Sequence, residues 1–449
     1  MKIMQVYLLY VLTLVLSQDL HAQSWTQLFD GKSLNGWRKL HSSTSEYTVS
    51  HGELVGTTND KSVTTHLATA KEYDDFILEL EVNISEGLNS GIDLRSKLLP
   101  DGKVVGYQID VDGWPRKWSG GLYEENGRGW VGIPEINPKA KDALKTGAWN
   151  KYRIEAIGSV IRVWINNIPI VTYIDDVNTK GFISIQIHHA MKPEDIGKTI
   201  RWRNMRIQTA NLKPMPVDMN TPVINLTDHI SAEESNQGFV SLQNDSDFTG
   251  WRSVHSTSPP DQRWTNRNGI FKIDKSNGSE TGNDIVATRQ YGTFELVFDF
   301  KLSEGANSGV KYFVNEQFDS GGKSGIGLEY QVLDDALHPD AKEGVVGNRT
   351  LASLYDLIPS TKPATQFQKK IGEWNKGRIV AMPNQWVQHW LNGFKVVEYE
   401  RNSNIFKALV ARSKYTGYAG FGSAPKGYIL LQDHGDAVEF KNIRIRELN

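Results

Sequence analysis

The sequence contains no cysteine, and this absence narrows the chemistry open to the chain. Without thiols there are no disulfides, no thiolate nucleophile and no cysteine-ligated zinc or iron–sulfur centre. An excess of one charge is also missing, because 50 Lys and Arg stand against 52 Asp and Glu, a formal net charge of −2. A balance so close to neutral gives no electrostatic reason to expect nucleic acid or an anionic membrane as partner.

Long apolar runs are equally scarce. Residues 6–16 form one such run after Lys2, and small residues follow at Ala22 and Ser24, an order typical of a secretory signal peptide. The run is too short for a spanning helix, which needs roughly 20 apolar residues, and no later stretch approaches that length. We therefore expect residues 1–23 to be removed and the mature chain to be periplasmic or secreted, with no transmembrane segment. An uncleaved N-terminal anchor is the alternative.

Glycine and aromatic residues are abundant instead, with 40 Gly, 16 Pro and 10% aromatic residues. Few stretches show a helical period, so this composition favours many short strands joined by turns. We expect an all-β protein.

The chain repeats itself after 218 residues, because residues 73–91 match residues 291–309 without a gap. Further blocks recur in the same order: 36–41 with 250–255, 107–108 with 330–331, 149–151 with 374–376, 164–166 with 390–392, and 186–188 with 432–434. The sequence thus predicts two copies of one domain, at 24–210 and 238–449. Residues 211–237 read as a linker, in which the capping-box spacing of Ser231 and Glu234 predicts a short helix.

Apolar residues alternate with other residues in the matching segments, as in Phe76, Leu78, Leu80 and Val82 and in their counterparts from Phe294 to Phe300. This period of two is typical of a half-buried strand, and Asn392-Gly393 is a hairpin signal. Domains of about 200 residues built from such strands are most simply two packed antiparallel sheets. We predict two β-sandwiches in tandem.

No serine-hydrolase, P-loop, HExxH or GxGxxG pattern is convincing, so candidate residues must come from the polar groups that both copies keep. His188 and His434 each follow a glutamine, Gln186 or Gln432, by two residues in a strand-like run. Period two puts each Gln and His on one face, where the imidazole could act as base, acid or metal ligand. The alternative is an ordinary histidine satisfied by a neighbouring strand or exposed at an edge.

Acidic residues form a second candidate group. Glu329 and Gln331 share a strand face and precede Asp334 and Asp335, and the matching block of the first copy reads Gly106 to Asp112. This alignment puts Gly106 at the place of Glu329, with Gln108 and Asp110 further along. Paired carboxylates cleave glycosides or bind Ca²⁺, while adjacent aspartates also favour turns.

Two further features allow two interpretations each. Asn89-Ser90-Gly91 and Asn307-Ser308-Gly309 look like turns or strand beginnings. Trp114, Trp118 and Trp130 fall in a Gly-rich segment with Arg116, Lys117 and Arg128. They could stack on sugar rings or simply pack a long loop.

At these blocks the sequence resembles the 3-keto-disaccharide hydrolase family. The second copy carries the resemblance through residues 307–309, 329–335, 338–341, 353–356, 372–375, 390–393, 432–435 and 440–444, and the first copy resembles a sister variant through 89–95, 107–108, 121–124, 128–130, 149–150 and 203–206. The resemblance implies a concanavalin-like jelly-roll sandwich. It also implies a carbohydrate substrate, a glycoside whose sugar is already oxidised at C3.

Such a substrate allows elimination, because a C3 carbonyl acidifies the C2 proton and lets the aglycone leave from C1 before water adds. We assign His434 as base or metal ligand, Glu329 as its charge partner or leaving-group acid, and Asn307 with Gln331 as orienting groups. Their first-copy counterparts are His188, Asp110 and Tyr123. The remaining substrate-contact candidates are Asn89, Ser90, Arg95, Gln108, Arg128, Ser308, Asp335, Tyr355 and Gln432. A divalent cation could assist, with ligands unassigned.

The two copies also differ. Phe313 stands opposite Arg95, and the alignment leaves Glu329 without a counterpart in the first copy. One catalytic and one binding copy is therefore an alternative, as is a non-catalytic, lectin-like sugar-binding protein.

Overall fold

The computed structural model describes residues 25–40, 46–59, 64–134, 137, 139–216, 218, 220–276, 282–318, 324–361 and 369–448. The expected signal peptide, 1–23, lies outside these residues. Within them, no helix is both long and apolar enough to cross a membrane.

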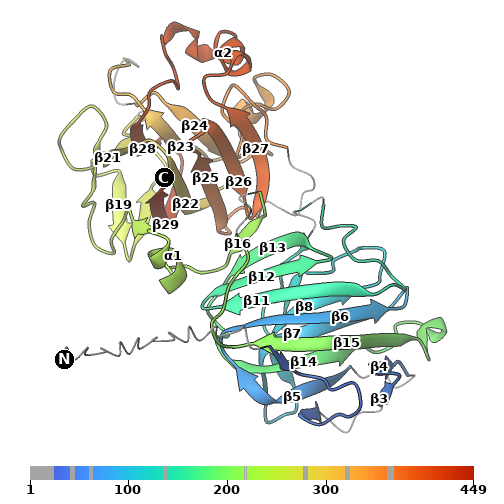
Figure 1. The fold of residues 1–449 in the computed structure, drawn as a ribbon. Helices are drawn as coiled ribbons and strands as arrows, with labels where there is room; N and C mark the ends of the chain where they lie inside the picture. Colours follow the sequence, from blue (N-terminus) through green and yellow to red (C-terminus); the bar gives the residue numbers. More distant parts are fainter. Residues whose placement is uncertain are drawn as a thin grey trace, which may run out of the picture.

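Each copy folds into two facing sheets, which confirms the predicted all-β architecture of two tandem antiparallel sandwiches (Figure 1). We call the sheet that carries the candidate residues the site sheet and the other the outer sheet. The site sheet of the first copy runs, in spatial order, β10 (Gly129–Gly132), β9 (Leu122–Glu125), β8 (Val104–Asp112), β7 (Asn89–Leu98), β14 (Gly181–Ile187), β5 (Thr65–Tyr73) and β2 (Trp37–Leu40).

The outer sheet of the first copy runs β16 (Val223–Asn225), β13 (Ile168–Ile174), β12 (Val160–Ile165), β11 (Asn150–Ile157), β6 (Phe76–Ile84), β15 (Thr199–Gln208), β4 (Glu53–Thr57) and β3 (Glu46–Ser50), with β1 (Thr26–Gln27) on β15. A short 3-10 helix, η2 (Pro193–Asp195), precedes β15.

The second copy repeats this plan. Its site sheet runs β18 (Trp251–Ser253), β21 (Ile285–Tyr291), β28 (Gly427–Leu431), β23 (Asn307–Val314) and β24 (Leu328–Leu333). Its outer sheet runs β19 (Trp264–Arg267), β20 (Ile270–Ile273), β29 (Val438–Glu447), β22 (Phe294–Leu302), β25 (Asn375–Ala381), β26 (Trp386–Leu391) and β27 (Phe394–Glu400), with β17 (Val240–Ser241) on β29. Its helical turns are η3 (Pro339–Lys342), α2 (Asn404–Val410) and η4 (Lys414–Gly417).

The predicted alternation in β6 is real, since Phe76, Leu78 and Val82 are buried between the sheets. Its outward positions are covered as well. Glu79, for example, accepts hydrogen bonds from Arg153 at 2.9 Å and from Arg206 at 2.5 Å. Long basic side chains thus cover the outer face of the sheet, so β6 is more buried than period two predicts.

The segment between the copies is structured. β16 pairs in parallel with β13 of the first copy, and α1 (Ala232–Asn236) begins with the predicted capping box of Ser231 and Glu234. Glu234 also accepts hydrogen bonds from Arg444 of the second copy at 2.9 Å and from Asn225 at 2.7 Å. This segment therefore joins the two sandwiches through direct contacts.

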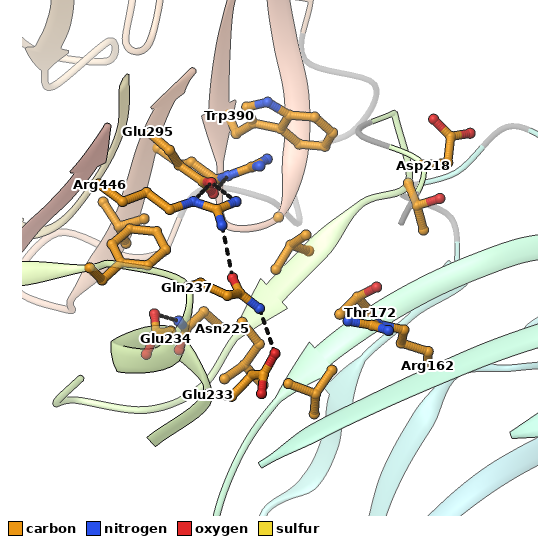
Figure 2. A pocket seen from close by; sticks show the side chains of 18 of the residues that line it. Arg162, Thr172, Asp218, Asn225, Glu233, Glu234, Gln237, Glu295, Trp390 and Arg446 are labelled. Atoms are coloured by element: carbon orange, nitrogen blue, oxygen red, sulfur yellow. Dashed lines mark hydrogen bonds and ion pairs between the residues drawn. The ribbon is translucent and has the colours of Figure 1, made fainter. Parts of the chain in front are cut away.

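A cavity of about 480 Å³ lies between the copies. Figure 2 shows Gln237 bridging Glu233 and Arg446, with Arg446 also bound to Glu295. The strands that line the cavity belong to the outer sheets, among them β12, β13, β22, β25 and β26. The copies consequently pack through their outer sheets. The outward face of each site sheet, which we call its open face, lies away from this interface.

Candidate active site

In the second copy, strand register brings Glu329 and Lys311 together. Lys311 of β23 pairs with Glu329 of β24, and Gly309 pairs with Gln331. Tyr312 and Tyr330 alternate with these residues and are buried in the core, so Lys311, Glu329 and the Gln331 side chain share the open face. A Cβ at position 309 would collide with Oε1 of Glu329, which shows that this carboxylate lies across β23.

Two lysines lie near this carboxylate. Lys311 lies beside it and also approaches Asp284 of the same sheet, with Nζ to Oδ2 at 3.4 Å. Burial raises the pKa of Asp284, and the Lys311 ammonium opposes that rise. Burial lowers the pKa of Lys414, while the nearby Glu329 carboxylate opposes that shift. Two cations and Glu329 thus meet at one end of the open face.

The loops after β24 place Tyr355 at the same end. Its hydroxyl donates to Asp340 at 2.8 Å, and Lys414 Nζ lies 4.0 Å from the centre of its ring. Arg349 binds both Asp340 and Asp356 at 2.9 Å, which fixes the loop. Tyr355, predicted as a substrate contact, therefore lies near Glu329, and burial raises its pKa.

His434 is exposed and lies near the other end of this face, with His338 and Asp436 as neighbours. The two imidazole rings are 6.0 Å apart, and the three side chains each offer one ligand atom within 4.8 Å of the others. Asp436 also accepts the backbone N–H of Asn307 at 3.0 Å, and His338 Nδ1 accepts that of Asp340 at 3.2 Å. Sequence reasoning missed His338 and Asp436 as site residues, although Asp436 follows His434 by two positions. These three side chains could hold a divalent cation.

The first copy has a different register from the one its Tyr-Gln block suggests. Asp93 of β7 pairs with Gln108 of β8, and Gly91 pairs with Asp110. A Cβ at position 91 would collide with Gln108, as one at 309 would with Glu329. Gln108 therefore occupies the place of Glu329 and Asp110 that of Gln331. The alignment that placed Gly106 opposite Glu329 is wrong by two residues.

The buried charge pair beside Glu329, Lys311 with Asp284, has its basic and acidic members exchanged in the first copy, where Asp93 and His66 stand at the same places. His66 precedes Leu67, which pairs with Ile185, just as Asp284 precedes Ile285, which pairs with Leu431. Asp93 stands where the second copy has Lys311. His66 Nε2 lies 3.5 Å from Asp93 Oδ2 and 3.2 Å from Glu125 Oε2. His66, Asp93 and Glu125 form the second group whose spacing suits a metal ion.

Arg116 organises the other end of the first open face. It pairs with Asp112 at 2.8 Å and Asp110 at 3.4 Å. Its guanidinium carbon also lies 4.5 to 5.0 Å from the ring centres of three tryptophans, namely Trp114, Trp118 and Trp130. The three tryptophans are half-buried around one guanidinium, as expected if they pack the loop. Each also keeps some exposed surface.

His188 and Asp110 lie next to this group of Arg116 and tryptophans. His188 packs edge-on against Trp114 with ring centres 5.8 Å apart and stacks on His189 at 4.3 Å, and burial lowers its pKa. Burial, and next the charge of Asp112, raises the pKa of Asp110. Asn89 donates to Asp110 at 3.0 Å.

The sequence matches the 3-keto-alpha-glucoside-1,2-lyase-like domain over residues 24–208 and again over residues 238–446. The chain belongs to this family. This confirms the family resemblance seen in the sequence, and it means that both site sheets are those of 3-keto-glucoside-lyase-like domains.

The chain is also similar to individual proteins. A 3-keto-disaccharide hydrolase of Bacteroides thetaiotaomicron is 35% identical over 236 residues, which cover 47% of this chain and 79% of the relative. A solved glycosyl hydrolase candidate of Parabacteroides distasonis is 28% identical, covering 49% of this chain and 99% of its own, with a TM-score of 0.43. A β-glucanase of Bacillus licheniformis, 13% identical with a TM-score of 0.29, covers 42% of this chain and 98% of its own.

Several predicted contact residues have structural partners away from the open faces of the lyase-like domains. Arg95 is fully buried at a bulge with φ of 50°, as is Phe313 in the second domain at 51°. The Arg95 guanidinium donates to the backbone carbonyls of Asp74 and Gly158, both at 2.7 Å. Arg128 binds Glu124 and Asp175 and so links the two sheets of the first domain. Arg95 is thus enclosed by its partners, whereas the side chain of Arg128 remains 38% exposed, so Arg128 stays a candidate sugar contact.

Three smaller candidates also serve the backbone. Ser90 and Ser308 point into the sandwich and donate to the carbonyls of Gln186 at 2.6 Å and Gln432 at 2.7 Å. Asp335 accepts the N–H of Leu351 at 2.6 Å. These residues shape the site sheets and their loops.

The remaining candidates do lie on the open faces. Tyr123 pairs with Gln108 across β9 and β8 and packs against Trp130 with ring centres 5.2 Å apart. Four buried side-chain atoms here have no hydrogen-bond partner within the described structure: His66 Nδ1, Gln186 Oε1, Asn307 Oδ1 and Gln432 Oε1. Buried polar atoms of this kind are uncommon and mark places where a ligand, ion or water completes the bonding.

Proposed function

We propose that the protein cleaves glycosides whose sugar carries a keto group at C3. The family and the Bacteroides relative support this substrate class. The observation that carries it furthest is the position of the Glu329 carboxylate across Gly309, beside Lys311 and near Lys414. Acid–base groups and cations on one face of a sheet suit a reaction that moves protons and builds negative charge on oxygen.

The reaction proceeds by elimination followed by hydration. A base removes the C2 proton, the electron pair forms the C1–C2 double bond, and the C1–O bond breaks with its electrons on the aglycone oxygen. That oxygen takes up a proton, after which water adds its hydroxyl to C1 and a proton to C2. The developing negative charge rests on the C3 oxygen, so cations near that oxygen lower the barrier.

The second domain supplies groups for each task. His434 is the base, since its imidazole is exposed and within reach of a bound sugar. Glu329 handles the proton of the leaving group, and Lys311 and Lys414 face the developing enolate. Asn307 and Gln331 orient the sugar, and His338 with Asp436 could hold a cation that polarises the carbonyl.

The first domain differs at two of these positions. Gln108 cannot exchange a proton as Glu329 can, and Asp93 reverses the charge of Lys311. We therefore infer that turnover takes place in the second domain, while the first domain, with its tryptophans around Arg116, binds sugar or performs a different step.

The competing function is sugar binding without catalysis in either domain. The half-exposed tryptophans of the first domain favour a sugar-binding surface there. Assays of a 3-keto-glucoside beside its unoxidised parent separate the two. Turnover of the keto compound alone supports the enzyme, whereas saturable binding without product supports the lectin-like protein.

We also infer that residues 1–23 are a cleaved signal peptide and that the mature protein works in the periplasm or outside the cell, as domains 24–210 and 238–449 joined by 211–237. N-terminal sequencing of the protein from fractionated cells tests this. A chain that keeps Met1 in the cytoplasmic fraction would contradict it.

A further inference from the structure

The first domain carries a buried acidic cluster that its counterpart lacks. His66 comes from β5, Asp93 from β7 and Glu125 from β9. The side chains of His66 and Asp93 are 4% and 1% exposed, and that of Glu125 is 17% exposed. One imidazole thus meets two carboxylates in a place almost without solvent, open only along Glu125.

The charges of this cluster are not balanced. In the second domain the same two places hold Lys311 and Asp284, one cation and one anion. In the first domain, when Asp93 and Glu125 are both ionised, even a protonated His66 leaves one negative charge, and no Lys or Arg among the described residues forms an ion pair with either carboxylate. An uncompensated charge in a buried place is costly, so a bound cation would stabilise the domain.

The distances suit metal coordination. Imidazole nitrogen and carboxylate oxygen bind first-row divalent ions at about 2.0 to 2.2 Å, so neighbouring ligand atoms stand about 3.0 to 3.5 Å apart. His66 Nε2 lies 3.2 Å from Glu125 Oε2 and 3.5 Å from Asp93 Oδ2, and the three ligand atoms are all within 4.8 Å of one another.

A fourth donor stands beside these three. Gln186 pairs with His66 across β14 and β5, and its Nε2 lies 3.4 Å from His66 Nε2. Its Oε1 is buried without a hydrogen-bond partner. Because an amide oxygen and nitrogen exchange places by a half turn, Gln186 can present that oxygen to an ion next to His66.

Outer contacts hold the carboxylate of Asp93 in place. Ser184 donates to Oδ2 at 2.5 Å and Gln108 donates to Oδ1 at 3.2 Å. Second-layer hydrogen bonds of this kind orient the ligands of metal sites.

We propose that the open face of the first domain binds one divalent cation through His66 Nε2, Asp93 and Glu125, with the amide oxygen of Gln186 as fourth ligand. Three oxygens and one imidazole suit an ion of the Mn²⁺ class. The site is separate from the His338, His434 and Asp436 group, and it stands whether or not the protein cleaves 3-keto sugars.

Mn²⁺ binding to the full chain tests this, after removal of ions with EDTA, by calorimetry and by the electron paramagnetic resonance signal of free Mn²⁺. The H338Q chain is the first sample, since it weakens the other metal-compatible group and leaves the first domain untouched. We expect it to bind one Mn²⁺ per chain with a dissociation constant below the millimolar range. Failure to bind any Mn²⁺ there would overturn the proposal.

The second sample is E125Q in the H338Q background, which removes one ligand charge without changing side-chain size. We expect Mn²⁺ affinity to fall at least tenfold while the circular dichroism spectrum stays the same. A matched control is E86Q, which changes an exposed glutamate of the same domain and should leave affinity unchanged. Unchanged affinity in E125Q, or an equal loss in E86Q, would overturn the assignment of ligands. Binding does not depend on turnover, so these results stand apart from the glycoside assay.

Discussion

Glu329 lies across Gly309, on the neighbouring strand of the second site sheet, where a side chain on residue 309 would collide with its Oε1. The absence of a side chain at 309 thus gives the carboxylate its place near Lys311 and Lys414. Gln108 and Gly91 have the same relationship in the first domain. The two sites therefore share the same strand register and differ in the side chain at this place, which is Glu329 in the second domain and Gln108 in the first.

Replacing Gly309 with alanine tests this relationship. The new methyl group would push the Glu329 carboxylate aside, and small displacements of reacting groups cost about 10- to 100-fold in rate. We expect kcat/KM for a 3-keto-glucoside to fall by that factor with the fold intact. The control is Gly417→Ala, where an added Cβ meets nothing within 4 Å and the turnover should not change. Full activity of the G309A protein would contradict the proposed role of Glu329.

His434→Gln tests the base. Loss of a positioned acid or base typically lowers the rate by about 100-fold or more. We expect kcat to fall by that amount, with a smaller change in KM, and the His188→Gln protein to keep most of its turnover because we place catalysis in the second domain. Equal losses in the two variants would show that both domains react.

The stability of the first domain should depend on Asp93 in mildly acidic solution. Burial raises the pKa of Asp93 to about 6 from an ordinary 3.8, with the charge of Glu125 adding to the rise and His66 opposing it. Between these values folded Asp93 holds a proton that the unfolded chain has released, so the contribution of Asp93 to the free energy of unfolding decreases as pH rises from about 4 to about 6.

Chemical unfolding of the unmodified and D93N proteins, in EDTA and at several pH values, measures this effect. The difference in free energy between them should change across that window, with the unmodified protein losing stability relative to D93N as pH rises. A difference that stays constant, or that changes in the opposite direction, would contradict the assignment.

Arg95 should matter for stability rather than for turnover. Its buried guanidinium holds the carbonyls of Asp74 and Gly158 and the carboxylate of Asp75. Arg95→Ala leaves these partners without a donor, which should cost about 2 to 4 kcal/mol. We expect a lower unfolding temperature and an unchanged KM, with the exposed neighbour Lys97→Ala as control. A raised KM with normal stability would restore Arg95 as a sugar contact.

The strands and the sandwich could be predicted because alternation is a local signal. Phe76 to Val82 and the matching segment from Phe294 show it without reference to the rest of the chain. The short helix α1 could be predicted for the same reason, since Ser231 and Glu234 carry its capping signal themselves.

Register and long-range partners could not be predicted in this way. Tyr107-Gln108 and Tyr330-Gln331 share two letters, yet the pairing of β7 with β8 shifts them by two residues relative to β23 and β24. The bulge at Arg95 has a positive φ, which nothing in the residue type indicates. His66 and Glu125 meet across three intervening strands, and the second domain has Asp284 at the place of His66, so a search for residues shared by the two copies could not find them.

The most direct test of the account is the turnover of a 3-keto-glucoside and of its unoxidised parent by the unmodified chain, by E329Q and by Q108A. We expect the unmodified chain and Q108A to release aglycone from the keto compound only, and E329Q to be slower by about 100-fold. Cleavage of the unoxidised parent at a similar rate, or full activity in E329Q, would contradict the central claim that the second domain cleaves 3-keto sugars through Glu329.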